Sequence, residues 1–84
     1  MDITFSDHAR AKFAVLARHG VHLSEAQVRD TVSAPDHVEP SRKGRYVAQK
    51  GQTRTLVLRV IYRPTDDGVE VVTFYPGRRS RYES

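Results

Sequence analysis

An arginine lies in the middle of the most apolar stretch of this 84-residue sequence, and tyrosines occur in the segments on either side of it. Arg59 stands within Thr53–Arg63, whereas Tyr46 and Tyr75 stand in the neighbouring apolar segments. A guanidinium can donate two parallel hydrogen bonds to a phosphate, and tyrosine rings stack on nucleobases. Three such side chains on one face would form a phosphate-and-base site. The same pattern also fits an arginine that lays its stem over a sheet and keeps its charge in water.

Cleavage of RNA by its own 2′-hydroxyl requires a base, a cation at the phosphorane and an acid for the leaving oxygen. Arg59 is the expected cation, and Tyr46 or Tyr75 would position the base or transfer a proton. His8 is the candidate that titrates near neutral pH without help. His8 and Lys12 lie one helical turn apart, on a stripe that points away from the apolar face of their helix. They reach a sheet only if that helix begins at the sheet's edge; otherwise His8 is an exposed histidine.

Capping signals predict two helices in the first half of the chain. Ser6 is the expected N-cap of the first helix, which ends at Gly20 after a basic last turn. Ser24 and Gln27 form a capping box at the start of the second helix. That helix must end before Pro35, because a proline disfavours the helical conformation of the residue preceding it.

After the helices, apolar segments alternate with turns. Strands are predicted at Arg45–Lys50, Thr53–Arg63 and Val69–Tyr75, with a short additional strand from Val38 to Pro40. This order predicts an α+β fold, with two N-terminal helices packed on one face of a three- to four-stranded antiparallel sheet. Residues 1–77 form this single domain, and residues 78–84 form a short, frayed basic tail.

The loop lengths predict which residues oppose one another. If Pro64–Gly68 is a five-residue loop, Arg63 pairs with Val69, and Leu58 opposes Phe74 beneath the helices. A tight turn at Gly51-Gln52 would join the two preceding strands. The pairs then expected on the open face are Arg59 with Thr73, Val57 with Tyr75, Tyr46 with Val57, and Ile61 with Val71.

Positive charge is concentrated in the second half of the chain. Residues 1–41 carry four Lys/Arg and six Asp/Glu, whereas residues 42–84 carry ten and four. The net charge is +4, with eleven arginines and three lysines. This balance favours a polyanionic partner such as RNA, although it also fits simple solubility. The expected nucleic-acid contacts are Arg45, Thr73, Arg78, Arg79, Arg81 and Lys12.

Several function classes are excluded by composition. The absence of cysteine removes disulfide scaffolds, thiolate metal sites and cysteine nucleophiles. His19 and His22 have an H-x-x-H spacing, but no acidic cluster completes a ligand set, so we expect no metal and no cofactor. There is no apolar run of membrane-spanning length and no signal-peptide pattern. We therefore expect a cytoplasmic protein without a membrane partner.

Short segments of this sequence together resemble the domain of unknown function 4258 family. The resemblance extends from about Phe5 to Pro76, and that family is similar to small RelE- and BrnT-like toxins. It implies a RelE-like fold, a ribonuclease activity and a cognate antitoxin protein. The segments that carry it are His8-Ala9-Arg10, Gly20-Val21, Glu39-Pro40, Gly44-Arg45-Tyr46, Leu58-Arg59-Val60-Ile61-Tyr62 and Val71-Val72-Thr73-Phe74-Tyr75-Pro76.

The expected function is therefore that of a toxin-like small RNA-binding protein. It would be a metal-independent endoribonuclease if a proton-transfer group lies beside Arg59. The alternative is a non-catalytic module that binds a protein or nucleic acid through the same open face. A homodimer through that face is also consistent with the sequence, because Val57, Ile61 and Val71 would leave it partly apolar.

Overall fold

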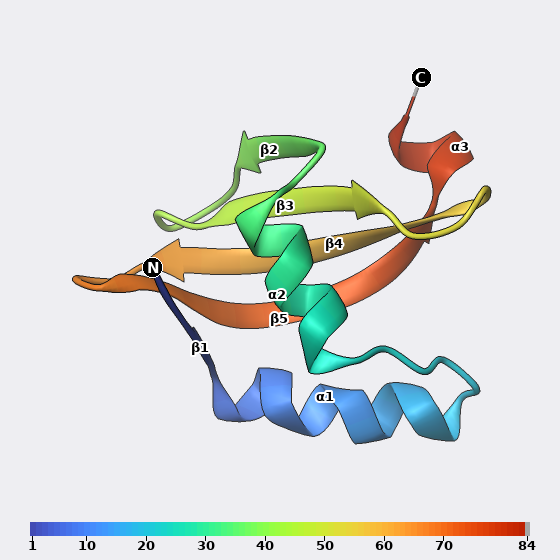
Figure 1. Ribbon diagram of the computed structural model, residues 1–84, viewed down its shortest axis with the longest axis horizontal. Coiled ribbons are helices and arrows are strands. Elements are labelled where there is room, and N and C mark those ends of the chain that lie inside the picture. The colour runs from blue at the N-terminus through green and yellow to red at the C-terminus, as the bar shows by residue number, and fades with distance from the viewer. Residues whose placement is uncertain (84) are drawn as a thin grey trace.

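Five strands form one mixed sheet in the computed structural model, which describes residues 1–83 (Figure 1). The strand order is β1-β5-β4-β3-β2; β1 is parallel to β5, and the other neighbours are antiparallel. The α+β class is thus confirmed, whereas the purely antiparallel sheet of three to four strands is wrong. The elements are β1 (Asp2–Phe5), α1 (Asp7–Arg18), α2 (Glu25–Ser33), β2 (His37–Pro40), β3 (Tyr46–Gly51), β4 (Leu56–Pro64), β5 (Gly68–Arg78) and α3 (Arg79–Tyr82).

The strand that sequence patterns did not reveal is β1. Asp2–Phe5 pairs in parallel with Gly68–Val71, at the opposite end of the described chain. A hairpin can be recognised in a sequence from the turn residues between its two strands. Two parallel strands are joined only through a long crossover. Four residues before a helix cap therefore carry no local sign of their pairing.

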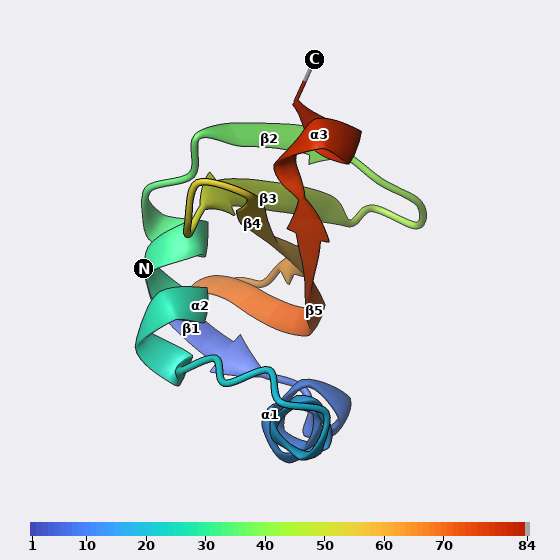
Figure 2. The same ribbon diagram turned by 90° about the vertical axis from the view of Figure 1, so that its right-hand side faces the viewer.

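Both predicted helix starts are confirmed, but the packing of the two helices on one face is wrong. The Ser6 side chain accepts a hydrogen bond from the backbone of Ala9, and Ser24 and Gln27 form the capping box. α2 covers one face of the sheet, whereas α1 runs along the edge formed by β1 and β5 (Figures 1 and 2). α1 follows β1 directly, and the Ser6 amide donates to the carbonyl of Val71 at 2.9 Å. The start of α1 is thereby fixed at this edge.

The core lies between the sheet, α2 and the inner side of α1. Phe74, Leu58, Val28 and Val71 are completely buried there. Phe13 of α1 packs against Phe74 with ring centroids 4.6 Å apart. Leu58 and Phe74 are therefore in the core as expected, although they do not oppose each other. No helix among residues 1–83 is both long and apolar enough to cross a membrane.

The register between β4 and β5 differs from the expected one by two residues over the functional region. Val60 pairs with Phe74, and Arg59 pairs with Tyr75 instead of Thr73. One residue of the shift comes from a shorter loop, because Pro64 rather than Arg63 opposes Val69. The other comes from an irregularity after Ile61, where β5 has an extra residue. A shift of two leaves these side chains on their expected faces. Between the β4–β5 loop and the irregularity the shift is only one, so Val71, which was expected on the open face, lies in the core.

The register between β3 and β4 corrects the position of Tyr46. Gly51 pairs with Val57, so the connection is longer than the expected tight turn, and Tyr46 lies opposite Tyr62 rather than Val57. An odd shift moves a side chain to the other face of a sheet. Tyr46 consequently stacks on Tyr62 with ring centroids 5.7 Å apart, on the side of the sheet that carries the core. It does not belong to the open face.

The expected frayed tail is wrong for residues 78–83, while Ser84 lies outside the described residues. β5 continues to Arg78, and α3 then lies on the face opposite α2 (Figure 2). Gly51 and Gly77, which both pair with Val57, make room for it. A side chain at Gly51 would collide with Arg79, and one at Gly77 with the ring of Tyr82. The face that α1 and α2 leave open is therefore partly covered by α3.

Candidate nucleic-acid interface

Polar side chains form a continuous row across the open face of the sheet, from the start of α1 to β2. The row contains five residues that the sequence predicted, namely His8, Lys12, Arg59, Thr73 and Tyr75. They come from α1, β4 and β5, and contacts between their side chains connect them. The edge position of α1 makes this possible, because it lets a polar stripe of the helix reach over β5.

Thr73 is the point at which α1 and the sheet meet. Its Oγ1 lies 3.2 Å from Nε2 of His8 and accepts a hydrogen bond of 3.2 Å from Nζ of Lys12. His8 is exposed, whereas Lys12 and Thr73 are half-buried. An imidazole, an ammonium and a hydroxyl are thus held at one place, and the imidazole is open to solvent. A phosphate oxygen that replaced the threonine hydroxyl would meet one donor, the Lys12 ammonium, beside an imidazole nitrogen whose role depends on its tautomer.

The ring of Tyr75 lies near two cations. Nζ of Lys12 is 6.0 Å from the ring centroid, and the guanidinium carbon of Arg59 is 5.8 Å from it. The Tyr75 hydroxyl accepts a hydrogen bond of 3.0 Å from Nε of Arg59. Because the oxygen is the acceptor in that bond, the hydroxyl hydrogen is free to donate to a ligand.

Arg59 is more enclosed than the sequence suggested. Only 8% of the residue is exposed. Nη1 donates to Oε1 of Gln49, and Nη2 donates to Oε1 of Glu39 at 2.9 Å. Burial disfavours the charged form, but the hydrogen bonds to Tyr75 and Glu39 outweigh it, so the pKa of Arg59 is raised above its ordinary value. Arg59 therefore stays charged and is already partnered in the plane of its guanidinium.

The flat face of Arg59 is also occupied. Its guanidinium carbon lies 4.1 Å from the centroid of the Tyr82 ring, which α3 places over it. An aromatic ring stacked on a guanidinium is a favourable contact, and it shields the cation from solvent. In this arrangement each nitrogen of the Arg59 guanidinium already donates to a partner within the chain, and this face of it is covered.

Sequence reasoning missed three members of the row, namely Glu39, Gln49 and Tyr82. The correct register would have revealed Gln49, because it opposes Arg59 and is only 4% exposed. Glu39 lies on β2, one strand further away, and no local pattern links it to β4. Tyr82 was assigned to a tail. Gly51 and Gly77, which both pair with Val57, were the available signal that a segment packs over the sheet there.

The remaining predicted residues lie away from the centre of the row. Arg45 is in the turn before β3, at the end of the sheet that is remote from α3 (Figure 1). Arg79 donates to the carbonyl of Thr53 and to Glu83, so its charge is used within the chain. Arg78, the last residue of β5, and Arg81, within α3, are exposed. They can contribute to a positive field over the open face, but not to the contacts around Thr73.

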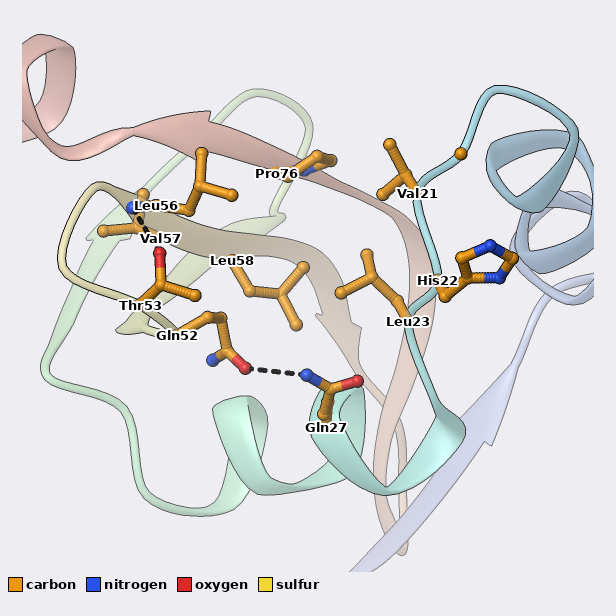
Figure 3. A pocket seen from close by; sticks show the side chains of 11 residues that line it. Val21, His22, Leu23, Gln27, Gln52, Thr53, Leu56, Val57, Leu58 and Pro76 are labelled. Atoms are coloured by element: carbon orange, nitrogen blue, oxygen red, sulfur yellow. Dashed lines mark hydrogen bonds between the residues drawn. The ribbon is translucent and has the colours of Figure 1, made fainter.

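A cavity of about 260 Å³ lies on the other side of the sheet, between the α1–α2 connection and the β3–β4 loop (Figure 3). Val21, Leu23 and Leu58 contribute to its mainly apolar lining. A hydrogen bond of 3.2 Å from Gln27 to Gln52 joins two of the residues around it. None of the predicted site residues lines this cavity.

Within residues 1–83, no three His, Asp or Glu side chains are grouped so that they could hold a metal ion. No family model matches the chain, and neither a curated protein nor a solved structure matches it. The functional interpretation therefore rests on the geometry of the row.

Proposed function

We propose that this protein is a toxin-like, RelE-like RNA-binding protein of the cytoplasm that cleaves RNA on its open sheet face. The observation that carries the proposal is the convergence of His8 and Lys12 on Thr73, each at 3.2 Å. A base, a cation and a hydrogen-bond donor at one solvent-accessible point are what phosphodiester cleavage requires. A net charge of +4 supports an anionic substrate. The resemblance to RelE- and BrnT-like toxins adds a cognate antitoxin as the expected protein partner.

The reaction assigned to this site is attack of a ribose 2′-oxygen on the adjacent phosphorus. Neutral His8 takes the 2′-hydroxyl proton, and the ammonium of Lys12 donates a proton to the departing 5′-oxygen as the phosphorus–oxygen bond breaks. The products are a 2′,3′-cyclic phosphate and a 5′-hydroxyl. The hydroxyls of Thr73 and Tyr75 donate to the phosphate oxygens during the attack.

The role of Arg59 in this reaction is to position Tyr75. It was expected to bind phosphate directly, but its guanidinium already donates to Gln49 and Glu39. Its hydrogen bond to the Tyr75 oxygen fixes that hydroxyl and directs the remaining hydrogen outward. A lysine cannot make the three contacts at once, because a single ammonium does not span the planar fork of an arginine.

Cleavage of an end-labelled, mixed-sequence RNA tests the proposal. The wild-type protein should produce cyclic phosphate ends in the presence of a chelator. His8→Ala and Lys12→Met should each slow cleavage by about 100-fold or more. The matched controls are His22→Ala, an exposed histidine in the α1–α2 connection, and Lys50→Met on the helix-side face. Equal activity of the site variants and the controls would refute the assignment.

A second candidate is a non-catalytic module that binds nucleic acid or protein through the same face. The enclosed state of Arg59 favours it, since a group committed to Glu39 and Tyr82 is not available to a reacting phosphate. In that case purified protein leaves RNA intact but binds it, and Lys12→Met still weakens binding. Intact RNA together with binding would therefore establish the module and reject the ribonuclease.

A further inference from the structure

Tyr82 occupies a place on the open face that is shaped for a flat ring. Its ring lies over the guanidinium of Arg59 at 4.1 Å, and Gly77 beneath it has no side chain. Val57, which pairs with Gly77, is completely buried under this contact region. A planar guanidinium, a glycine floor and an apolar base together accept an aromatic ring and little else.

The segment that supplies this ring is anchored to the sheet through Arg79. The Arg79 amide donates to the carbonyl of Thr55 at 2.8 Å, and Nε of Arg79 donates to the carbonyl of Thr53 at 2.7 Å. Tyr82 is the last residue of α3, which has four residues. A single helical turn has little stability of its own. A rotation about the Arg79 anchor would take Tyr82 off Arg59 without breaking a strand pairing of the sheet.

The position of the Tyr82 ring is also close enough to Thr73 for one nucleotide to occupy both. Arg59 pairs with Tyr75, so Thr73 is its diagonal neighbour, at about 7–8 Å between backbones. The distance is within the reach of one nucleotide that places its phosphate at Thr73 and its base over Arg59. A base in that position would stack on the same guanidinium face that Tyr82 now covers.

We infer that the position of the Tyr82 ring over Arg59 is a nucleobase-binding subsite, which the free protein fills with its own tyrosine. The inference rests on the proposed function, in that RNA supplies the base. Tyr82 then competes with the ligand, and α3 must lift before a base can bind. Stacking does not depend on the identity of the base, so the subsite accepts any of the four.

Binding of adenosine 5′-monophosphate to the full chain tests the subsite separately from cleavage. Tyr82→Ala should bind it about fivefold more tightly than wild type, or better, as expected for one newly available stacking position. Tyr82→Phe keeps the ring and should behave as wild type. Tyr46→Ala removes a tyrosine from the other face and should also leave the affinity unchanged. Ribose 5-phosphate, which lacks a base, should show no gain with Tyr82→Ala.

A second measurement follows Arg59 without any nucleotide. Phenylglyoxal modifies exposed arginines, and mass spectrometry of peptides reports the rate for Arg59 alone. Tyr82→Ala should raise that rate several-fold, and Tyr46→Ala should not. Unchanged or weaker nucleotide binding by Tyr82→Ala overturns the subsite, even if the wild type cleaves RNA. Tighter nucleotide binding without RNA cleavage by any variant supports the subsite and overturns the proposed ribonuclease.

Discussion

Glu39 on β2 and Arg59 on β4 are joined by an ion pair of 2.9 Å that reaches across the strand between them. Gln49 of that middle strand is uncharged and accepts a hydrogen bond from the same guanidinium. The edge strand β2 is only four residues long, and this contact ties it to the centre of the sheet. The ion pair thus serves the fold as well as the site, because it determines where Arg59 can point.

Removal of the negative charge of Glu39 should weaken both the attachment of β2 to the sheet and the positioning of Arg59. Glu39→Gln should lower the free energy of unfolding by about 1 kcal/mol, a low value because the Glu39 side chain is 44% exposed. Urea unfolding followed by circular dichroism measures it. Glu70→Gln, which removes a surface partner of Arg63, is the matched control and should cost less. An equal loss of unfolding free energy in the two variants would mean that the Glu39–Arg59 ion pair adds no more stability than a surface ion pair.

Loss of the Phe74 ring should be the most damaging single change in the core. Phe74 is completely buried and packs on Phe13, so Phe74→Ala should cost about 3–5 kcal/mol. A domain of this size is expected to be near its limit of stability after such a loss. Val15→Ala on the exposed side of α1 is the control and should leave the unfolding midpoint almost unchanged. A stable Phe74→Ala variant would contradict the observed packing of α1 on the sheet.

Alkaline pH should destabilise the protein partly through Tyr62. Burial raises the pKa of Tyr62 above its ordinary value of 10.0, and the charge of nearby Tyr46 acts in the same direction. The folded state therefore holds this proton more tightly than the unfolded state. Its contribution to stability is complete below pH 10 and is lost as the pH rises through the raised folded pKa. The urea midpoint should fall less between pH 9 and pH 11 for Tyr62→Phe than for wild type.

A side chain at Gly68 should separate β1 from the rest of the sheet. A Cβ there would collide with the backbone of Asp2, which pairs with Gly68. Backbone atoms of a paired strand cannot move aside as a flexible side chain can. Gly68→Ala should therefore raise amide hydrogen exchange of Thr4 and Phe5 and lower the unfolding midpoint. Gly44→Ala tests a glycine at φ 71° with open space around it, so it introduces backbone strain without a collision and should leave β1 protected.

RNA binding should depend on salt in a way that identifies Lys12. The logarithm of the affinity should fall linearly with the logarithm of salt concentration, and Lys12→Met should reduce the slope by about 0.7, the value for one phosphate contact on a single strand. Lys50→Met changes the net charge equally but removes a lysine that pairs with Asp30 on the helix side. The slope of that control should stay as in wild type. A slope near zero for the wild type would exclude a nucleic-acid role.

Local signals were sufficient for the helices and for the faces of β4. The Ser24–Gln27 capping box and the proline at position 35 act within a few residues, so the sequence pattern contains them. Arg59, Thr73 and Tyr75 were placed on one face because alternation along a strand survives a register error of two. His8 and Lys12 joined them on a stated condition, a helix starting at the sheet edge, and that condition is met.

The errors come from the lengths of connections and from contacts between residues far apart in sequence. The Tyr46 prediction depended on the length of the β3–β4 connection, and an odd difference placed the ring on the other face. β1 has its partner at the far end of the described chain, and α3 depends on glycines in two other strands. Neither turn chemistry nor hydrophobic period reports such contacts, because both describe only neighbours along the chain.

The parallel pairing of β1 with β5 has a consequence for synthesis on the ribosome. Asp2–Phe5 emerges well before its strand partner in the described part of the chain, which begins at Gly68, so β1 waits unpaired until β5 has left the exit tunnel. α1 waits with it, because Ser6 is held by the carbonyls of Val71 and Val72. His8 and Lys12 consequently can reach Thr73 only after β5 has been synthesised. A nascent chain that stalls before β5 carries α1 but no assembled row, so the proposed activity cannot appear before β5 has been made.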